Sequence, residues 1–415
     1  FVLYLCKSMI NCAFRLANCK CCFGHVQILI TMDANNSSLR LPQIGFDMPI
    51  TDLIMELEKL RYKVFQGTTH SLVFEQIKGI FHMLESIGSS RIEGNNTTIM
   101  DYVESTKIEN DPIKAAEEQI QEIVNIEKAT KYVEDTMDER PFSLQYVREL
   151  HAMVVEGLSS GKEGSDAPGE FRHGNVRISG SAHVPPDYTQ VEPMMRELVE
   201  FINAPAAPKY DLLKICIAHH RFVWIHPFGN GNGRTVRLFT YGMLLRNVFT
   251  SKQRIINPTA IFCSDRNAYY HYLEQADKGD DNGLIAWSEY VLHGLKREIE
   301  KIDKLIDYTF LRTHILLPAI VDALENRYVT ENEYEILKTT LLLESQELQA
   351  GELKVIFNDK SSPEISRLIK SLVGKKMLAP IHDKARKYVI SFANNYLLRS
   401  ILKQLDKNGF LPLRK

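Results

Sequence analysis

The chain has 415 residues, of which 44% are hydrophobic and 25% are charged, and its formal net charge is −2. That length predicts two or three domains with a substantial hydrophobic core. The composition excludes a disordered chain, a collagen-like repeat and a small disulfide-stapled protein. The sequence contains no run of 18 apolar residues, so it predicts no helix that spans a bilayer.

Residues 1–31 differ in character from the rest of the chain. Five of the seven cysteines fall within residues 1–22, and the apolar start precedes the first positive charge, unlike a signal peptide. We expect this segment to be an unstructured or non-native appendage. A zinc site is the alternative for the cysteines, but no second Cys/His pair at knuckle spacing supports it. Cysteines without a disulfide framework predict a reduced, cytoplasmic compartment.

Apolar residues recur at helical spacing through most of the chain. The Gly-, Ser- and Pro-rich stretch 159–186 contains one alternating piece, NVRISG, which predicts a small β-hairpin. Strand-like runs are otherwise scarce, so the predicted body is mainly α with one inserted hairpin. Its main helices are predicted at residues 51–65, 71–87, 112–134, 144–157, 191–201, 210–225, 233–248 and 284–306.

The C-terminal part is basic. Residues 351–415 contain 14 Lys and Arg against 5 Asp and Glu, a local charge of +9, which leaves −11 for the rest. Helices predicted at 333–343, 350–357 and 363–375 precede two short strands around a basic turn. This order resembles a winged helix, a small α/β variant of the helix-turn-helix. DNA is therefore a candidate partner, and docking to protein or dimerisation is the alternative.

The most informative stretch is HPFGNGNGRTVR at residues 226–237, which lies between two predicted helices. Gly229, Gly231 and Gly233 allow backbone N–H groups to turn toward one point, and the last of them opens a helix. Such a loop, together with the positive end of a helix dipole, favours an anion. A glycine-rich turn joining two core helices is the alternative interpretation.

Two arginines and a histidine accompany this loop. Arg234 and Arg237 lie one helical turn apart, so both guanidinium groups face the same site and suit the oxygens of a di- or triphosphate. His226 has an ordinary pKa near neutrality, so it can serve as a general base. A base, an anion cradle and two arginines within twelve residues predict phosphoryl or nucleotidyl transfer.

This stretch resembles the signature H-x-F-x-[DE]-G-N-G-R-x-x-R of the Fic family of protein adenylyltransferases. The resemblance covers roughly residues 80–295 and implies a helical Fic-type core with a β-hairpin flap. It implies that His226 deprotonates a Ser, Thr or Tyr hydroxyl of a target protein or of the enzyme itself. That oxygen would attack the α-phosphorus of ATP, leaving AMP on the target and releasing pyrophosphate. The matching residues are His226, Phe228, Gly231, Asn232, Gly233, Arg234 and Arg237.

The resemblance also implies roles for the individual residues. Phe228 would anchor the loop in the core. Gly231, Asn232 and Gly233 would hold the α- and β-phosphates, while Arg234 and Arg237 would hold the β- and γ-phosphates. Outside the loop, Tyr270 and Asp277 would line the adenine pocket, and Val176, Arg177 and Ile178 would pin the target peptide by strand addition.

One position departs from the family pattern. Asn230 stands where the family has the Asp or Glu that holds Mg²⁺. An amide oxygen can ligate a hard cation, but it brings no negative charge. We therefore expect Mg²⁺ or Mn²⁺ with the ATP, and leave open whether Asn230 ligates it or the phosphates and water do.

The upstream segment SSRIEGNN resembles the family's inhibitory motif, [ST]-x-x-x-E-[GN], in the subgroup where the motif precedes the catalytic loop. Its residues are Ser89 and Glu93. A pair between Glu93 and Arg237 would remove the partner of the γ-phosphate and place a carboxylate in its stead. A solvated Glu in a polar turn is the alternative.

The predicted organisation has five parts. They are the appendage (1–31), N-terminal helices with the inhibitory motif (32–135), a Fic catalytic core (136–306), a connector (307–332) and a winged-helix-like domain (333–415). The expected activity is autoinhibited AMP transfer by a cytoplasmic enzyme, with a homodimer left open. The alternatives are a nucleotide-sensing DNA-binding regulator with weak catalysis, and an enzyme that removes AMP from modified targets with Glu93 orienting water.

Overall fold

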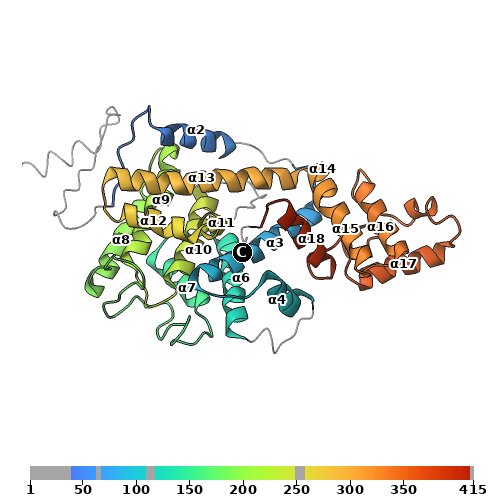
Figure 1. The fold of residues 1–415 in the computed structure, drawn as a ribbon, viewed down its shortest axis with the longest axis horizontal. Helices are drawn as coiled ribbons and strands as arrows, with labels where there is room; N and C mark the ends of the chain where they lie inside the picture. Colours follow the sequence, from blue (N-terminus) through green and yellow to red (C-terminus); the bar gives the residue numbers. More distant parts are fainter. Residues whose placement is uncertain (1–38, 62–66, 109–116, 248–257, 412–415) are drawn as a thin grey trace, which may run out of the picture. The chain divides into compact units, whose positions relative to one another are not determined.

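The fold is mainly helical, as the apolar periodicity predicts (Figure 1). The computed structural model describes residues 39–61, 67–108, 117–247 and 258–411. The appendage predicted at residues 1–31 lies outside them. In these four ranges no helix combines the length and apolarity needed to cross a membrane.

The helix predicted to end at residue 87 continues to Glu93, and predicted helical residues 62–65, 112–116 and 248 lie outside the described ranges. The helices before the C-terminal part include the eight predicted ones in the predicted order. They are α2 (Pro49–Arg61), α3 (Ser71–Glu93), α4 (Ile99–Val103), the π-helical turn η1 (Glu104–Ile108), α6 (Glu118–Thr136), α7 (Leu144–Val154), α8 (Tyr188–Asn203), the 3₁₀ turn η2 (Pro208–Tyr210), α9 (Asp211–Ile225), α10 (Asn232–Asn247), α11 (Pro258–Cys263), α12 (Arg266–Ala276), α13 (Asp281–Ile306) and α14 (Tyr308–Phe310).

Helix α10 is surrounded by other helices. Every residue from Arg234 to Leu245 is buried, and α10 packs against α9, α7, α6 and α3. A helix that is buried on all sides belongs to the interior of a fold. The arginines that begin this helix are therefore held in the core rather than at the surface.

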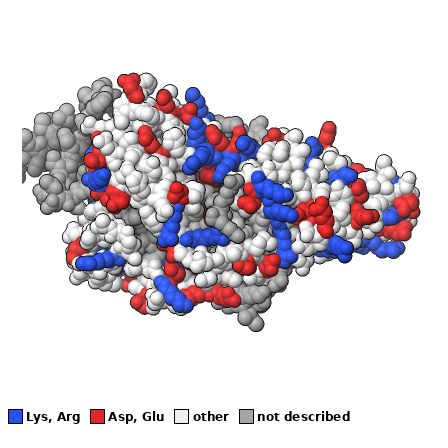
Figure 2. Space-filling view, viewed as in Figure 1, with Lys and Arg blue, Asp and Glu red and all other residues white. Residues whose placement is uncertain are grey.

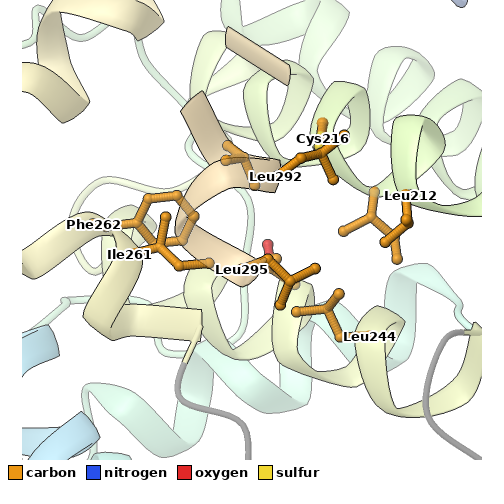
Figure 3. A pocket seen from close by; sticks show the side chains of 10 residues that line it. Leu212, Cys216, Leu244, Ile261, Phe262, Leu292 and Leu295 are labelled. Atoms are coloured by element: carbon orange, nitrogen blue, oxygen red, sulfur yellow. The ribbon is translucent and has the colours of Figure 1, made fainter. Parts of the chain in front are cut away.

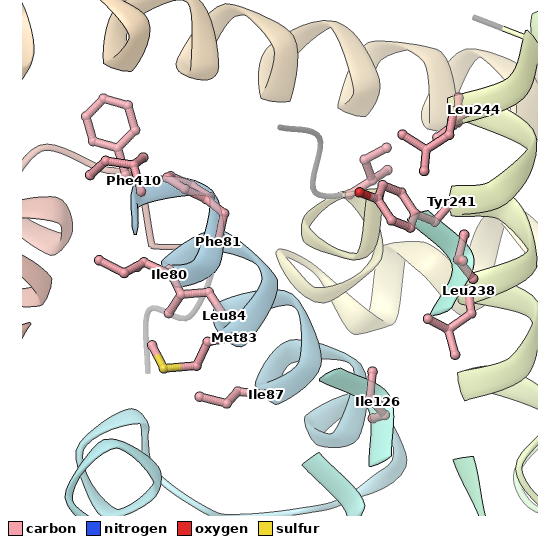
Figure 4. Close-up of a cluster of buried hydrophobic side chains, with 14 of the residues drawn as sticks. Ile80, Phe81, Met83, Leu84, Ile87, Ile126, Leu238, Tyr241, Leu244 and Phe410 are labelled. Carbon is pink, nitrogen blue, oxygen red and sulfur yellow. The ribbon is translucent and has the colours of Figure 1, made fainter. Parts of the chain in front are cut away.

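Helix α3 adds a second wall to this core. In Figure 4, Ile80, Leu84 and Ile87 project from α3 within the cluster that also holds Ile126 of α6 and Tyr241 of α10. Burying an aliphatic side chain of this size stabilises a fold by about 1.5–3 kcal/mol. The C-terminal end of α3, which carries Glu93, is thereby fixed beside the start of α10.

A small apolar cavity lies between α9, α10, α11 and α13. It measures about 10 Å³ and is lined by Leu212, Cys216, Phe262 and Leu292 among others (Figure 3). Its lining is almost entirely apolar, so even a single water molecule would lack hydrogen-bond partners there. We regard this cavity as a packing gap and not as a ligand site.

The C-terminal part contains π-helical η3 (Leu311–Leu316), α15 (Leu317–Glu325), α16 (Glu331–Leu342), 3₁₀ turn η4 (Glu352–Lys354), α17 (Ser362–Gly374), β1 (Leu378–Pro380), β2 (Tyr388–Ile390) and α18 (Leu397–Lys407). The strands pair antiparallel, with Ala379 opposite Val389. The predicted helix 350–357 is reduced to the turn η4, and α18 was not predicted. The winged-helix interpretation of this part stays a prediction.

The hairpin predicted around NVRISG has no strand pairing within the described residues. Residues 175–178 belong to no helix or strand, and the chain turns at Ser179 and Gly180, where Ser181 N–H donates to the Ile178 carbonyl at 3.3 Å. The alternating pattern therefore does not produce a strand ladder here. The two-stranded sheet lies in the C-terminal part instead.

Candidate active site

The loop between α9 and α10 begins with strained backbone. His226 follows the last residue of α9 with φ of 51°, and its N–H donates to the Phe222 carbonyl at 3.0 Å. Left-handed backbone is uncommon for residues other than glycine and persists where the surroundings fix it. Gly231 also has positive φ, of 71°, and a Cβ there would lie 3.0 Å from a Val155 methyl group. The loop therefore requires this glycine.

Phe228 and Asn232 fix the loop from within. The Phe228 ring is fully buried and stacks on His151 with 3.7 Å between ring centroids, which confirms its predicted role as an anchor. The Asn232 carboxamide accepts from the Phe228 N–H and donates to the Phe228 carbonyl, both at 2.9 Å. The Asn232 side chain thus closes the loop, and only its backbone remains for the predicted contact with phosphate.

His226 is held so that its imidazole stays uncharged. Arg172 donates from Nε to the His226 carbonyl at 2.9 Å. Burial lowers the pKa of His226 to about 4, although the nearby Val223 carbonyl opposes the shift. The ring is therefore neutral at physiological pH and able to accept a proton.

Arg237 makes the predicted contact with Glu93. Its guanidinium is almost completely buried and donates from Nε to the Ser89 hydroxyl at 2.9 Å. A terminal nitrogen, Nη2, donates to the Ser89 carbonyl at 2.8 Å and to Glu93 Oε1 at 2.7 Å. Burial favours protonation of Glu93, but the charges of Arg237 and Arg234 outweigh it and lower the pKa of Glu93. Glu93 is therefore a carboxylate paired with Arg237.

The Glu93 carboxylate lies against the first turn of α10. A Cβ added to Gly233 would stand 2.1 Å from Glu93 Oε1. The amides and dipole at a helix N-terminus favour an anion at this place. Glu93 therefore occupies the position that the sequence predicts for phosphate, and only glycine at position 233 leaves it room.

Arg234 is also engaged with carboxylates. Its side chain is fully buried, and Nη2 donates to the Glu163 carbonyl at 2.7 Å and to Glu163 Oε2 at 3.0 Å. On the other side, Nη1 lies 3.1 Å from Glu122 Oε1. Both predicted phosphate-binding arginines thus have carboxylate partners in this structure.

Asn230 takes part in the hydrogen bonds of the loop. Its Nδ2 donates to the Lys162 carbonyl at 2.6 Å, and its Oδ1 accepts from the Gly231 N–H at 2.7 Å. Across the described ranges, no group of three His, Cys, Asp or Glu side chains is arranged to hold a metal ion. Asn230 thus serves the hydrogen bonds of the loop itself, and its role as a metal ligand stays a prediction.

The predicted adenine and target residues lie on other elements. Tyr270 of α12 is 43% exposed, and the Arg266 guanidinium stands 5.5 Å from the centre of its ring. Asp277, at the end of α12, pairs with His220 at 2.8 Å. In the segment 175–178, Val176 and Ile178 are half-buried and Arg177 is exposed. Their binding roles stay predictions.

Two further residues shape the site, and neither was among the predicted site residues. Arg172 ends the sequence GEFR at residues 169–172 and, besides His226, donates to the carbonyls of Gly174 and Pro186 at 2.9 and 2.5 Å. His151 accepts from the Gly169 N–H at 2.9 Å, so its Nε2 carries the proton donated to the Asn230 carbonyl at 3.1 Å. A basic residue beside the predicted hairpin hinted at Arg172, whereas His151 resembled any core histidine.

The loop between α9 and α10 lies within a region of the chain that matches a known protein family. Residues 141–244 match the model of the Fic/DOC family. A protein adenylyltransferase Fic of Drosophila yakuba is 31% identical over 203 residues, covering 48% of this chain and 37% of that protein. The Nematostella vectensis protein of the same name is 28% identical over 239 residues, covering 56% of this chain and 52% of its own length.

A solved structure supports the fold. The Fic family protein from Desulfovibrio desulfuricans aligns over 85% of this chain and 98% of its own length, with a TM-score of 0.51 and 20% identity. That identity supports the architecture alone. The chain spans only 37% and 52% of the lengths of the two named relatives.

Proposed function

We propose that this chain is a protein adenylyltransferase that transfers AMP from ATP to a Ser, Thr or Tyr hydroxyl of a target protein, and the match of residues 141–244 to the Fic/DOC family model supports this proposal. The observation that carries the proposal is the loop itself. Residues 227–231 separate a neutral, strained histidine from the N-terminus of α10, and two buried arginines follow in the first turns of that helix.

In the proposed reaction, His226 accepts the proton of the target hydroxyl. The hydroxyl oxygen then attacks the α-phosphorus of ATP, a new P–O bond forms, and pyrophosphate leaves with the electrons of the broken bond. The amides that begin α10 would face the negative charge that develops on the phosphate oxygens. Arg172 would keep the His226 backbone, and hence its ring, in place.

No step of the proposed reaction is assigned to a divalent cation. The Mg²⁺ or Mn²⁺ expected with ATP would be held by phosphate oxygens and water, because Asn230 is occupied within the loop. When bound, such a cation offsets the negative charge of the triphosphate.

The contacts of Glu93 support the proposal that the enzyme is autoinhibited. The carboxylate lies against the N-terminal turn of α10 and accepts a hydrogen bond from a nitrogen of Arg237. These are the two groups that are proposed to bind phosphate. ATP would then bind without the geometry that in-line attack requires. Removal of the carboxylate is expected to expose the activity.

Intact-mass measurement tests this function. Glu93→Gly protein incubated separately with each of the four nucleoside triphosphates should gain the mass of AMP with ATP, by self-modification. The unsubstituted protein should gain little, and Glu93→Gly/His226→Ala should gain none. If Glu93→Gly gains no mass with any nucleotide and modifies no protein in an extract, the transferase proposal is wrong.

The C-terminal part supports a second proposed partner, DNA. Arg367 and Lys370 lie on the exposed side of α17, and Lys384 and Arg386 are exposed in the turn between β1 and β2. On the face shown in Figure 2, however, positive and negative side chains are interspersed. Binding that weakens steeply as salt rises, and that Arg367→Ala/Lys370→Ala reduces, would support a DNA-binding role.

A further inference from the structure

Arg234 is enclosed in a way that the inhibitory motif does not explain. Glu93 pairs with the other arginine, whereas Arg234 contacts Glu163 with one terminal nitrogen and Glu122 with the other. Neither acidic residue belongs to the inhibitory motif or to the catalytic loop. A phosphate oxygen that approaches Arg234 must therefore displace a different carboxylate.

We propose that Glu163 is a second inhibitory carboxylate, carried on a turn at residues 159–164 that Asn230 holds over Arg234. The inference rests on the proposed function, because it assumes that a nucleotide phosphate binds Arg234. It adds a restraint that removal of Glu93 leaves in place.

Hydrogen bonds fix the conformation of the turn at residues 159–164. The N–H groups of Lys162 and Gly164 both donate to the Ser159 carbonyl at 2.9 Å. A Cβ at Gly164 would stand 2.1 Å from the Leu158 carbonyl oxygen, so only glycine fits there. The Ser159 N–H donates to Glu118 at 2.7 Å, which ties the turn to the start of α6. The backbone of Glu163 is thereby fixed beside Arg234.

Asn230 closes the turn from the catalytic loop. Its Nδ2 donates to the Lys162 carbonyl at 2.6 Å and lies 3.3 Å from the Gly164 carbonyl oxygen. An Asp or Glu at this position could not donate, and its charge would repel both carbonyl oxygens. The departure from the family pattern at Asn230 therefore has a structural reason, and Asn230 is a positioning residue.

The two carboxylate partners of Arg234 differ in how freely their side chains can move. The Glu122 side chain is 2% exposed and accepts from Asn95 at 2.7 Å, so it is a fixed counter-ion. The Glu163 side chain is 38% exposed and can rotate into water. It lines a hollow of about 590 Å³ together with Glu93, Glu118, Glu122 and Lys162. Glu163 is therefore the carboxylate that a triphosphate can displace.

Affinity for ATP tests the role of Glu163 without relying on turnover. ATP is titrated by calorimetry into the full chain carrying Glu93→Gly, Glu93→Gly/Glu163→Gln or Glu93→Gly/Glu170→Gln. Glu170 is the matched control, because it is an exposed carboxylate of the same region that pairs with His173 and not with Arg234. The Glu163→Gln protein keeps the shape of the side chain but weakens its bond to Arg234.

We expect the Glu163→Gln substitution to lower the Kd for ATP about tenfold, the effect of losing one charge-assisted hydrogen bond. The Glu170→Gln substitution should leave it within about twofold. Equal Kd values for the Glu163→Gln and Glu170→Gln proteins would overturn the inference while leaving the nucleotide site intact. Absence of ATP binding by all three proteins would overturn both the inference and the proposed function.

Limited proteolysis tests the role of Asn230. Trypsin cleaves after lysine, and the Lys162 side chain is 71% exposed in the turn. Asn230→Ala and Asn230→Asp both remove the donated hydrogen bonds, so cleavage after Lys162 should become severalfold faster in both. Cleavage as slow as in the unsubstituted chain would show that Asn230 does not hold the turn.

Discussion

At the scale of single residues, the site is defined by the pair of Glu93 and Arg237, which lies beside Gly233. Gly233 lies between Glu93 and Arg237: an added Cβ would stand 2.1 Å from Glu93 Oε1 and 3.0 Å from Arg237 Nη1. The sequence suggests that this glycine serves the approach of phosphate. In the structure it serves the approach of the inhibitory carboxylate, so one residue permits both the active and the inhibited arrangement.

Gly233→Ala is therefore expected to act through Glu93. In the unsubstituted chain the new methyl group must displace the carboxylate, at a cost of about 1–3 kcal/mol in the free energy of unfolding. In the Glu93→Gly background the nearest atom is gone, so the cost should be smaller. Urea unfolding of the four proteins in this cycle measures the difference. An equal cost in both backgrounds would mean that Glu93 does not approach Gly233 in solution.

At the scale of elements, the sequence predicts helices better than their connections. The periodic helices at 71–87 and 233–248 are confirmed as α3 and α10. The helix predicted at 363–375 is confirmed as α17, and the Ser361 N–H before it donates to the Glu364 carboxylate at 2.8 Å. The catalytic loop and the Glu93–Arg237 pair were predictable because they follow a spaced motif.

The remaining contacts depend on tertiary packing. The segment 175–178 alternates like a strand, but no ladder forms there. Arg172 donates hydrogen bonds to the carbonyls of Gly174, before this segment, and Pro186, after it. Glu163 reaches Arg234 only through the turn at 159–164. Nothing in the spacing of these residues along the chain indicates such contacts.

Arg172 thus links the base to the segment proposed to hold the target. In the Glu93→Gly background, Arg172→Ala should reduce target modification roughly 100-fold, because small displacements of a reacting group are costly. The Kd for ATP should stay within about twofold. Arg196→Ala is the control, since Arg196 pairs with Glu192 on the exposed side of α8. Equal losses of ATP binding and of modification would contradict this role.

At the scale of the whole molecule, the buried histidines make the fold sensitive to acid. Burial lowers the pKa of His151 and His226 to about 4, and it also lowers that of His219 well below its ordinary value. In the unfolded chain these groups bind protons near their ordinary pKa of about 6.5. Between these values the unfolded state binds more protons, so the free energy of unfolding falls as the pH falls.

His151 offers a way to measure this effect. Its neutral ring fills the space beside Phe228 and both ring nitrogens are hydrogen-bonded, so protonation would oppose the native contacts. His151→Gln should lower stability at pH 7 through lost stacking. It should also reduce the pH dependence between pH 6.5 and 5 by up to one proton, or about 1.4 kcal/mol per pH unit.

Urea unfolding at pH 7, 6 and 5 separates this effect from the acidic side chains. Hydrogen bonds from His82 and Tyr241, together with the charges of His82 and Lys78, outweigh burial and lower the pKa of Glu134 to about 2, while Arg140 does the same for Glu149. The stability contributed by those carboxylates is lost only below their ordinary pKa of about 4.3. Burial raises the pKa of Glu122, Glu163 and Glu298, and these carboxyl groups contribute a slope of opposite sign above their ordinary pKa. The contribution of His151 is therefore the difference in slope between the His151→Gln protein and the unsubstituted chain. If His151→Gln leaves that slope unchanged, the native ring binds protons over the same pH range as the unfolded one, and its assigned bond from Gly169 must be wrong.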